Sequence, residues 1–69
     1  MKHDLLDALK IGLFHTERAA KQSLALQRMA LDKGMHGTAS VHAAQQHDAE
    51  MGAQVLRQQI ETLRKQRKI

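Results

Sequence analysis

The chain has 69 residues, no cysteine and a formal net charge of +4. This length allows one small domain, whose core would hide only about 60% of the surface exposed on unfolding. Without cysteine, the chain has no disulfide and no thiolate for zinc binding, redox chemistry or nucleophilic attack. Self-association therefore remains as the way to stabilise so small a scaffold.

The N-terminal sequence leads directly into an amphipathic pattern and lacks the uninterrupted apolar segment of a signal peptide. The longest apolar runs are a few residues, far short of the roughly 20 that a membrane span needs. We therefore expect a cytoplasmic protein that does not bind the membrane.

Residues 4–33 have the spacing of one long helix. Apolar and small residues recur every three or four positions on a first face, which we expect to pack on a second helix: Leu9, Leu13, Thr16, Ala20, Leu24, Gln27 and Leu31. A second line lies on the opposite side: Ile11, Phe14, Arg18, Gln22, Ala25 and Met29. Because a helix with two apolar faces must bury both, we expect the second line to contact another molecule.

The helix-forming sequence is interrupted only at residues 34–37, near the midpoint of the chain. A lysine followed by a glycine is typical of a helix end. Thr38 or Ser40 can then cap the next helix by accepting a hydrogen bond from its free amides. We therefore predict a turn over residues 34–39 and a second helix over residues 40–67.

The second helix has two adjoining apolar lines, which together form a broad face. Such a face lets a helix contact one neighbour in its own chain and one in another chain. We predict one all-α domain over residues 1–69, a two-helix antiparallel hairpin that forms a homodimeric four-helix bundle. The residues expected in the core and the dimer interface are Leu9, Leu13, Leu24, Leu31, Met51, Val55, Leu56, Ile60 and Leu63.

Five histidines invite a search for a metal site. His3 and Asp7 are four residues apart and His47 and Glu50 three apart, but two ligands do not make a site. The two serines lack the glycine pattern of a nucleophile elbow, and a two-helix chain offers no concave pocket of its own. We therefore expect no catalytic residue, no metal and no cofactor.

Protein binding accounts best for the remaining features. Phenylalanine and methionine beside arginine form the kind of patch that dominates binding energy, and methionine adapts to differently shaped partners. The predicted partner-binding residues are Ile11, Phe14, Arg18, Met29, Met35, His36 and Val41. The alternative, that these residues close the homodimer instead, remains open.

A basic cluster ends the second helix: Arg64, Lys65, Arg67 and Lys68. Positive charge at this end complements the helix macrodipole. The alternative function is a small helical dimer that binds RNA or DNA through this cluster, although the chain has few aromatic residues for base stacking. A third possibility is a secretion or assembly co-chaperone.

The cysteine-free helical hairpin, its length and its Ala, Gln, Arg and His bias resemble small phage-encoded anti-activators of LuxR-type quorum-sensing regulators. The resemblance implies a homodimer in the host cytoplasm that binds the DNA-binding domain of a transcriptional activator and blocks transcription. It also implies a second host target, the type IV pilus assembly ATPase. Because a DNA-binding surface is itself basic, we expect the contact to be mainly apolar.

Overall fold

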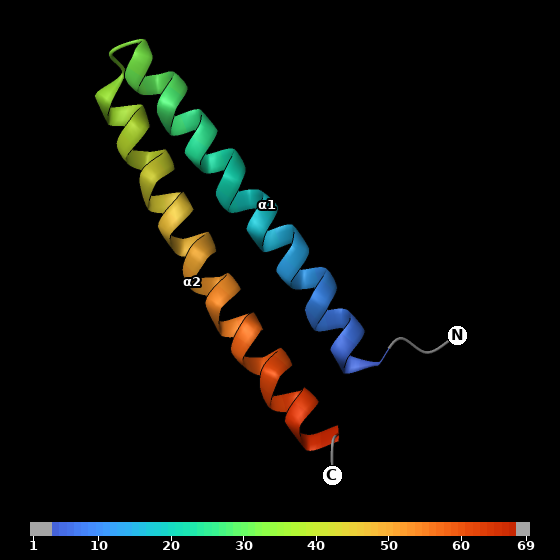
Figure 1. Cartoon of the computed structure of the whole chain (residues 1–69). Coiled ribbons are helices and arrows are strands. Elements are labelled where there is room, and N and C mark those ends of the chain that lie inside the picture. The colour runs from blue at the N-terminus through green and yellow to red at the C-terminus, as the bar shows by residue number, and fades with distance from the viewer. Residues whose placement is uncertain (1–3, 68–69) are drawn as a thin grey trace.

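Two long helices lie side by side and antiparallel in the computed structural model, which describes residues 4–67 (Figure 1). Helix α1 spans Leu5–Asp32 and helix α2 spans His36–Arg67. The first part of α2 is rich in alanine and contains no leucine. The described residues contain no strand. The predicted all-helical hairpin is therefore confirmed, whereas the four-helix bundle involves a second copy of the chain and stays a prediction.

Helix α1 begins with a side-chain cap. Asp4 has extended backbone angles, and its Oδ1 atom accepts a hydrogen bond of 2.9 Å from the backbone N–H of Asp7. Its Oδ2 atom accepts one of 2.8 Å from Nη2 of Arg67, in the last turn of α2. The Asp7 N–H and then the Arg67 guanidinium hold the pKa of Asp4 below its ordinary value. One carboxylate thus caps α1 and joins the two helices at the open end of the hairpin.

The turn is short because Gly34 adopts a left-handed conformation, with φ 74°. The N–H of Gly34 donates to the carbonyl of Leu31 at 3.0 Å, and that of Met35 donates to the carbonyl of Ala30 at 2.8 Å. This pair of bonds is a Schellman motif, which satisfies carbonyls at the end of α1. Glycine has no Cβ and accepts this conformation without steric cost.

The predicted turn over residues 34–39 is too long. Helix α2 begins at His36, and the carbonyl of Met35 already accepts a bond of 3.0 Å from the N–H of Ala39. Thr38 and Ser40, the predicted capping residues, lie inside the helix. Among residues 4–67, neither of their side chains forms a hydrogen bond. The prediction failed because Met35 both completes the Schellman motif and starts α2, so the chain needs no further loop.

The hairpin is a single layer of helices. It measures 54 × 23 × 12 Å, and the smallest dimension is about the diameter of one helix with its side chains. Its radius of gyration is 15.8 Å, against about 11 Å for a compact domain of this length. A single layer cannot enclose large side chains, and the buried residues are accordingly small except for one isoleucine: Ala20, Ala30, Ala39, Ala53 and Ile60.

The helices meet along a seam whose residues are all buried or half-buried. They alternate spacings of three and four, which is the pattern of an antiparallel coiled coil. A Cβ atom placed on Gly12 would lie 3.7 Å from Cδ1 of Leu56, and one placed on Gly52 would lie 3.6 Å from Cγ2 of Thr16. The seam consists of Leu6, Leu9, Leu13, Thr16, Ala20, Ser23, Gln27 and Ala30 on α1, and Ala39, His42, Gln46, Ala49, Ala53, Leu56, Ile60 and Leu63 on α2.

Six of the predicted core residues lie in or beside this seam: Leu9, Leu13, Leu24, Leu56, Ile60 and Leu63. The other three, Leu31, Met51 and Val55, are 46–51% exposed and do not belong to the core of the hairpin. Leu31 and Val55 flank the seam and Met51 lies on the outer side of α2, so the predicted apolar lines do not follow the contact. Their expected role in a dimer interface stays a prediction.

Candidate functional site

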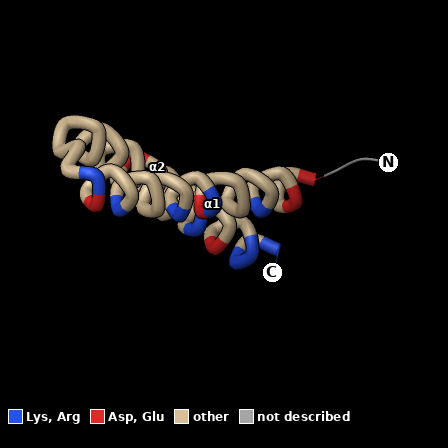
Figure 2. The backbone as a smooth tube through the Cα atoms, turned by 90° about the horizontal axis from the view of Figure 1, so that it is seen from above, with Lys and Arg blue, Asp and Glu red and all other residues tan. Residues whose placement is uncertain are grey.

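A flat hairpin has two broad faces, one on each side of the seam. Hollows on the two sides are lined by separate sets of residues, with none in common. Figure 2 shows most Lys, Arg, Asp and Glu positions along one side of the two tubes. The two faces therefore differ in chemistry, and we describe each in turn.

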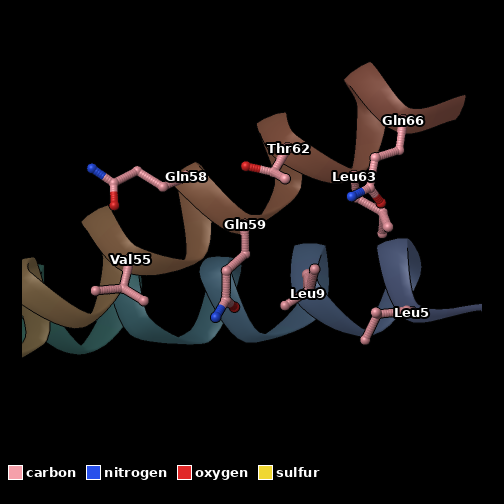
Figure 3. Close-up of a pocket in the computed structure, with 8 residues that line it drawn as sticks. All are labelled: Leu5, Leu9, Val55, Gln58, Gln59, Thr62, Leu63 and Gln66. Carbon is pink, nitrogen blue, oxygen red and sulfur yellow. The ribbon is translucent and has the colours of Figure 1, made fainter. Parts of the chain in front are cut away.

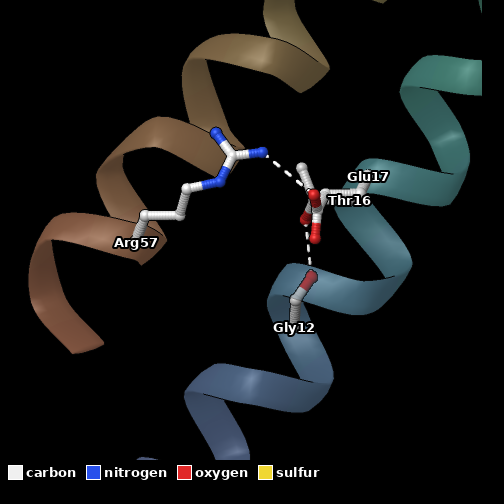
Figure 4. Close-up of polar contacts among 4 residues, drawn as sticks. All are labelled: Gly12, Thr16, Glu17 and Arg57. Carbon is white, nitrogen blue, oxygen red and sulfur yellow. Dashed lines mark hydrogen bonds and ion pairs between the residues drawn. The ribbon is translucent and has the colours of Figure 1, made fainter. Parts of the chain in front are cut away.

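The charged face carries acidic and basic side chains from both helices around two hollows of about 500 and 200 Å³. Nη2 of Arg57 donates to Oε2 of Glu17 at 3.0 Å across the seam (Figure 4). Both side chains are about half exposed, and such pairs contribute about 1 kcal/mol or less. The face consists of Lys10, Glu17, Lys21, Glu50, Arg57, Glu61 and Arg64.

The backbone of α1 beneath this ion pair has a further polar contact. Oγ1 of Thr16 donates to the carbonyl of Gly12 at 2.7 Å (Figure 4). The bond satisfies the hydroxyl within its own helix, so the methyl group of Thr16 is free to face Gly52 across the seam. A threonine thus serves as an apolar residue at the helix contact.

The charge-poor face lies on the other side of the seam. At the open end of the hairpin it has a hollow of about 580 Å³, whose eight lining residues are all uncharged (Figure 3). Leu9 and Leu63 of the seam lie between Leu5 on α1 and Val55 on α2, and glutamine side chains stand around them. An apolar side chain of another protein could pack in this hollow, and the glutamine amides at its edge could form hydrogen bonds with that protein.

Helical spacing extends the charge-poor face toward the turn. Leu26 follows Leu5 after three heptads, and Val41 precedes Val55 by two, so each pair lies on one side of its helix. The charged residue that this spacing places among them is Asp48. Exposed members of the face include Leu5, Leu26, Met29, Val41, Val55, Gln59 and Thr62.

The predicted partner-binding residues are all exposed, but they do not form one patch. Phe14 and Arg18 line a hollow of about 300 Å³ together with Glu17 and Lys21, at the edge of the charged face. The edge of the Phe14 ring also contacts His15, with 5.5 Å between centroids. Ile11 precedes them on the outer side of α1. The remaining four lie at the turn or on the charge-poor face: Met29, Met35, His36 and Val41.

Sequence reasoning missed Leu5 and Leu26 as surface residues, although they are 62% and 44% exposed. Neither residue was among the predicted core or partner-binding residues. The signal was present in the strict alternation of three and four positions, which places both residues beside the seam rather than in it.

The predicted basic cluster is divided in the structure. Arg67 pairs with Asp4, and Nζ of Lys65 lies 3.5 Å from Oε1 of Glu61. Arg64 turns to the charged face, where it lines the larger hollow. Lys68 lies outside the described residues. Half of the cluster is thus engaged with carboxylates.

Of the two pairs considered as metal ligands, only His47 and Glu50 lie wholly within the described residues. Within residues 4–67, no three His, Asp or Glu side chains gather in a way that could hold a metal ion. His3, the partner expected for Asp7, lies outside this part of the chain. Neither described helix has an apolar stretch long enough to cross a membrane.

Comparison with known proteins leaves the family open. The sequence matches no protein-family model, and neither the curated proteins nor the solved structures include a significant match. Functional inference for this chain therefore depends on its own surface chemistry.

Proposed function

We propose that this chain is a non-enzymatic protein-binding module whose apolar surface is completed by other protein chains. The observation that supports this most is the exposure of ten large apolar side chains, by 44–62%, on a hairpin only 12 Å thick. Exposed apolar surface on this scale is typical of protein interaction sites.

We further propose that one of these other chains is a second copy, which completes a homodimeric four-helix bundle. The hairpin exposes 5453 Å², about 1,000 Å² more than the roughly 4,400 Å² expected for a compact monomer of its mass. A stable interface of standard size buries about 800 Å² on each partner. The excess surface is therefore enough for one such interface.

The target that we propose is the DNA-binding domain of a LuxR-type transcriptional activator, and the second proposed target is the type IV pilus assembly ATPase. The charge-poor face supports this proposal because it lets a chain with a net positive charge approach a basic surface without repulsion. A basic DNA-binding surface would repel a cationic partner, but it can approach a face whose charged residue is Asp48. Occupying that surface would block DNA binding and hence transcription.

Light scattering measures the mass of the free protein and so tests the homodimer. A titration with a purified LuxR-type DNA-binding domain then tests the proposed target. Leu26→Ala, on the charge-poor face, should weaken binding about tenfold or more, as expected for a large apolar residue at the centre of an interface. Leu31→Ala is the matched control, because Leu31 is equally exposed on α1 but lies three heptads after Lys10, on the side of the charged face, and it should leave affinity unchanged. Both variants should retain the helical content of the wild type.

Three outcomes would contradict parts of this proposal. A monomeric mass would remove the homodimer. A dimer that binds no such domain would remove the LuxR-type target but keep the module. Tight binding to RNA or DNA that falls steeply with salt would favour the alternative function, and neutral substitutions at Arg64 and Lys65 should then abolish it.

A further inference from the structure

The seam has two chemically different halves. In the half at the open end, the helices meet through large apolar side chains: Leu6, Leu9, Leu13, Leu56, Ile60 and Leu63. In the half at the turn, they meet through small and polar ones: Ala20, Ser23, Gln27, Ala30, Ala39, His42, Gln46 and Ala49. Burial of apolar area stabilises in proportion to that area, so the turn half gains much less from the contact.

The polar side chains of the turn half make their hydrogen bonds along their own helix. Nε2 of Gln46 donates to Oε1 of Glu50 at 3.0 Å, and Nδ1 of His42 lies 3.0 Å from Oε1 of Gln45. By contrast, the ion pairs that join α1 to α2 both lie on the open-end side of Ala20. Among the described residues, the turn half thus has no ion pair across its seam, and its seam positions hold no large apolar side chain.

Apart from the half-buried Leu24 beside the seam, the large apolar side chains of the turn half point away from it. Leu26, Met29, Leu31, Met35 and Val41 are 44–56% exposed. Their burial therefore adds little to the contact between the two helices, and the arrangement is the reverse of that at the open end.

We infer that the turn half, residues 20–49, opens as a unit while the open-end half stays paired. Opening separates two short stretches that remain linked by the turn, and it exposes mainly Ala, Ser, Gln and His to water. Once separated, each stretch loses its backbone hydrogen bonds readily, because a lone helix of this length is marginal in water. Segments with few buried apolar contacts open at a free energy well below that of global unfolding. A partner that packs on the exposed apolar residues of this half would hold the two stretches at one separation.

Amide hydrogen exchange of the full chain, resolved by residue, tests the inference. Protection factors over residues 24–32 and 38–46 should be at least ~10-fold lower than those over residues 9–16 and 53–60. Fraying at the chain ends would produce the opposite gradient, so it cannot imitate this result. Equal protection in both halves, or higher protection near the turn, would overturn the inference.

A pair of matched double variants tests the cause. Gln27→Leu with His42→Leu replaces seam residues by leucine, and it should raise protection in the turn half about tenfold while leaving the open-end half unchanged. Gln22→Leu with His47→Leu makes the same chemical change at exposed positions on the same two helices, and it should have no such effect. If the two double variants behave alike, the composition of the seam does not control opening and the inference fails.

Discussion

The open end and the turn end of the hairpin are held together by different means. At the open end, nothing covalent joins the helices, and leucine packing, the Asp4–Arg67 contact and a helix cap keep them paired. At the other end, three residues of chain between α1 and α2 hold the helices close. Because so short a loop has already fixed the distance between its ends, that end tolerates Gln and His in its seam. The comparison teaches that side-chain packing is needed most where the covalent chain constrains least.

The largest test of this comparison removes packing at each end in turn. Ile60→Ala at the open end should lower the free energy of unfolding by about 2–4 kcal/mol, because it deletes a buried aliphatic side chain. Met29→Ala near the turn should cost less than about 0.5 kcal/mol, because Met29 is 54% exposed. Urea unfolding followed by circular dichroism measures both. An equal loss at Met29 would mean that a second copy of the chain covers the turn half.

A smaller effect tests whether the backbone of the turn is as important as proposed. Gly34→Ala should destabilise the hairpin by about 1 kcal/mol, because Gly34 has a positive φ that a Cβ atom disfavours. Gly37→Ala is the matched control in α2, where a Cβ atom meets nothing within 4 Å. It should instead stabilise by about 0.5 kcal/mol through higher helix propensity. Thermal unfolding of the two variants should therefore shift in opposite directions, and a shared sign would contradict the role of Gly34.

The smallest expected effect is on the pH dependence of stability, through Asp4 at the open end of the hairpin. Because the pKa of Asp4 is lowered in the folded protein, its contribution to stability is present above the ordinary value of 3.8 and is lost as the pH falls through the folded-state pKa. Asp4→Ala should therefore flatten the acid limb of a plot of urea midpoint against pH. Arg67→Gln, which keeps the cap on Asp7, should flatten it only in part. An unchanged acid limb in Asp4→Ala would show that other carboxylates control it.

Much of the fold was predictable because its signals are local. The first helix was expected over residues 4–33 and observed as Leu5–Asp32, since its apolar spacing and a helix-ending glycine mark its extent. That Asp4 caps the helix from outside was not predicted. The start of α2 was placed four residues too late, because Thr38 and Ser40 are good capping residues by type. Capping preference could not reveal that Met35 would already start the helix from the Schellman motif.

The surface was less predictable, because it depends on which apolar line faces the other helix. Exposure of Phe14 and Ile11 was expected, but their separation from Met29 and Val41 was not, since a line that winds around a helix reaches both faces of a flat hairpin. The two faces themselves were missed. They appear only when the seam is known, because the seam decides which side of each helix a charged residue occupies.

The sequence by itself thus determined two long helices and their reversal at Gly34. These features depend on residues within a few positions of one another, so hydrogen bonding and backbone sterics specify them locally. Only the tertiary structure decided that Leu31, Met51 and Val55 lie outside the seam, and that Glu17 pairs with Arg57 and Asp4 with Arg67. Adjoining apolar lines on a helix are nearly equal in hydrophobicity, and the register between two helices chooses among them.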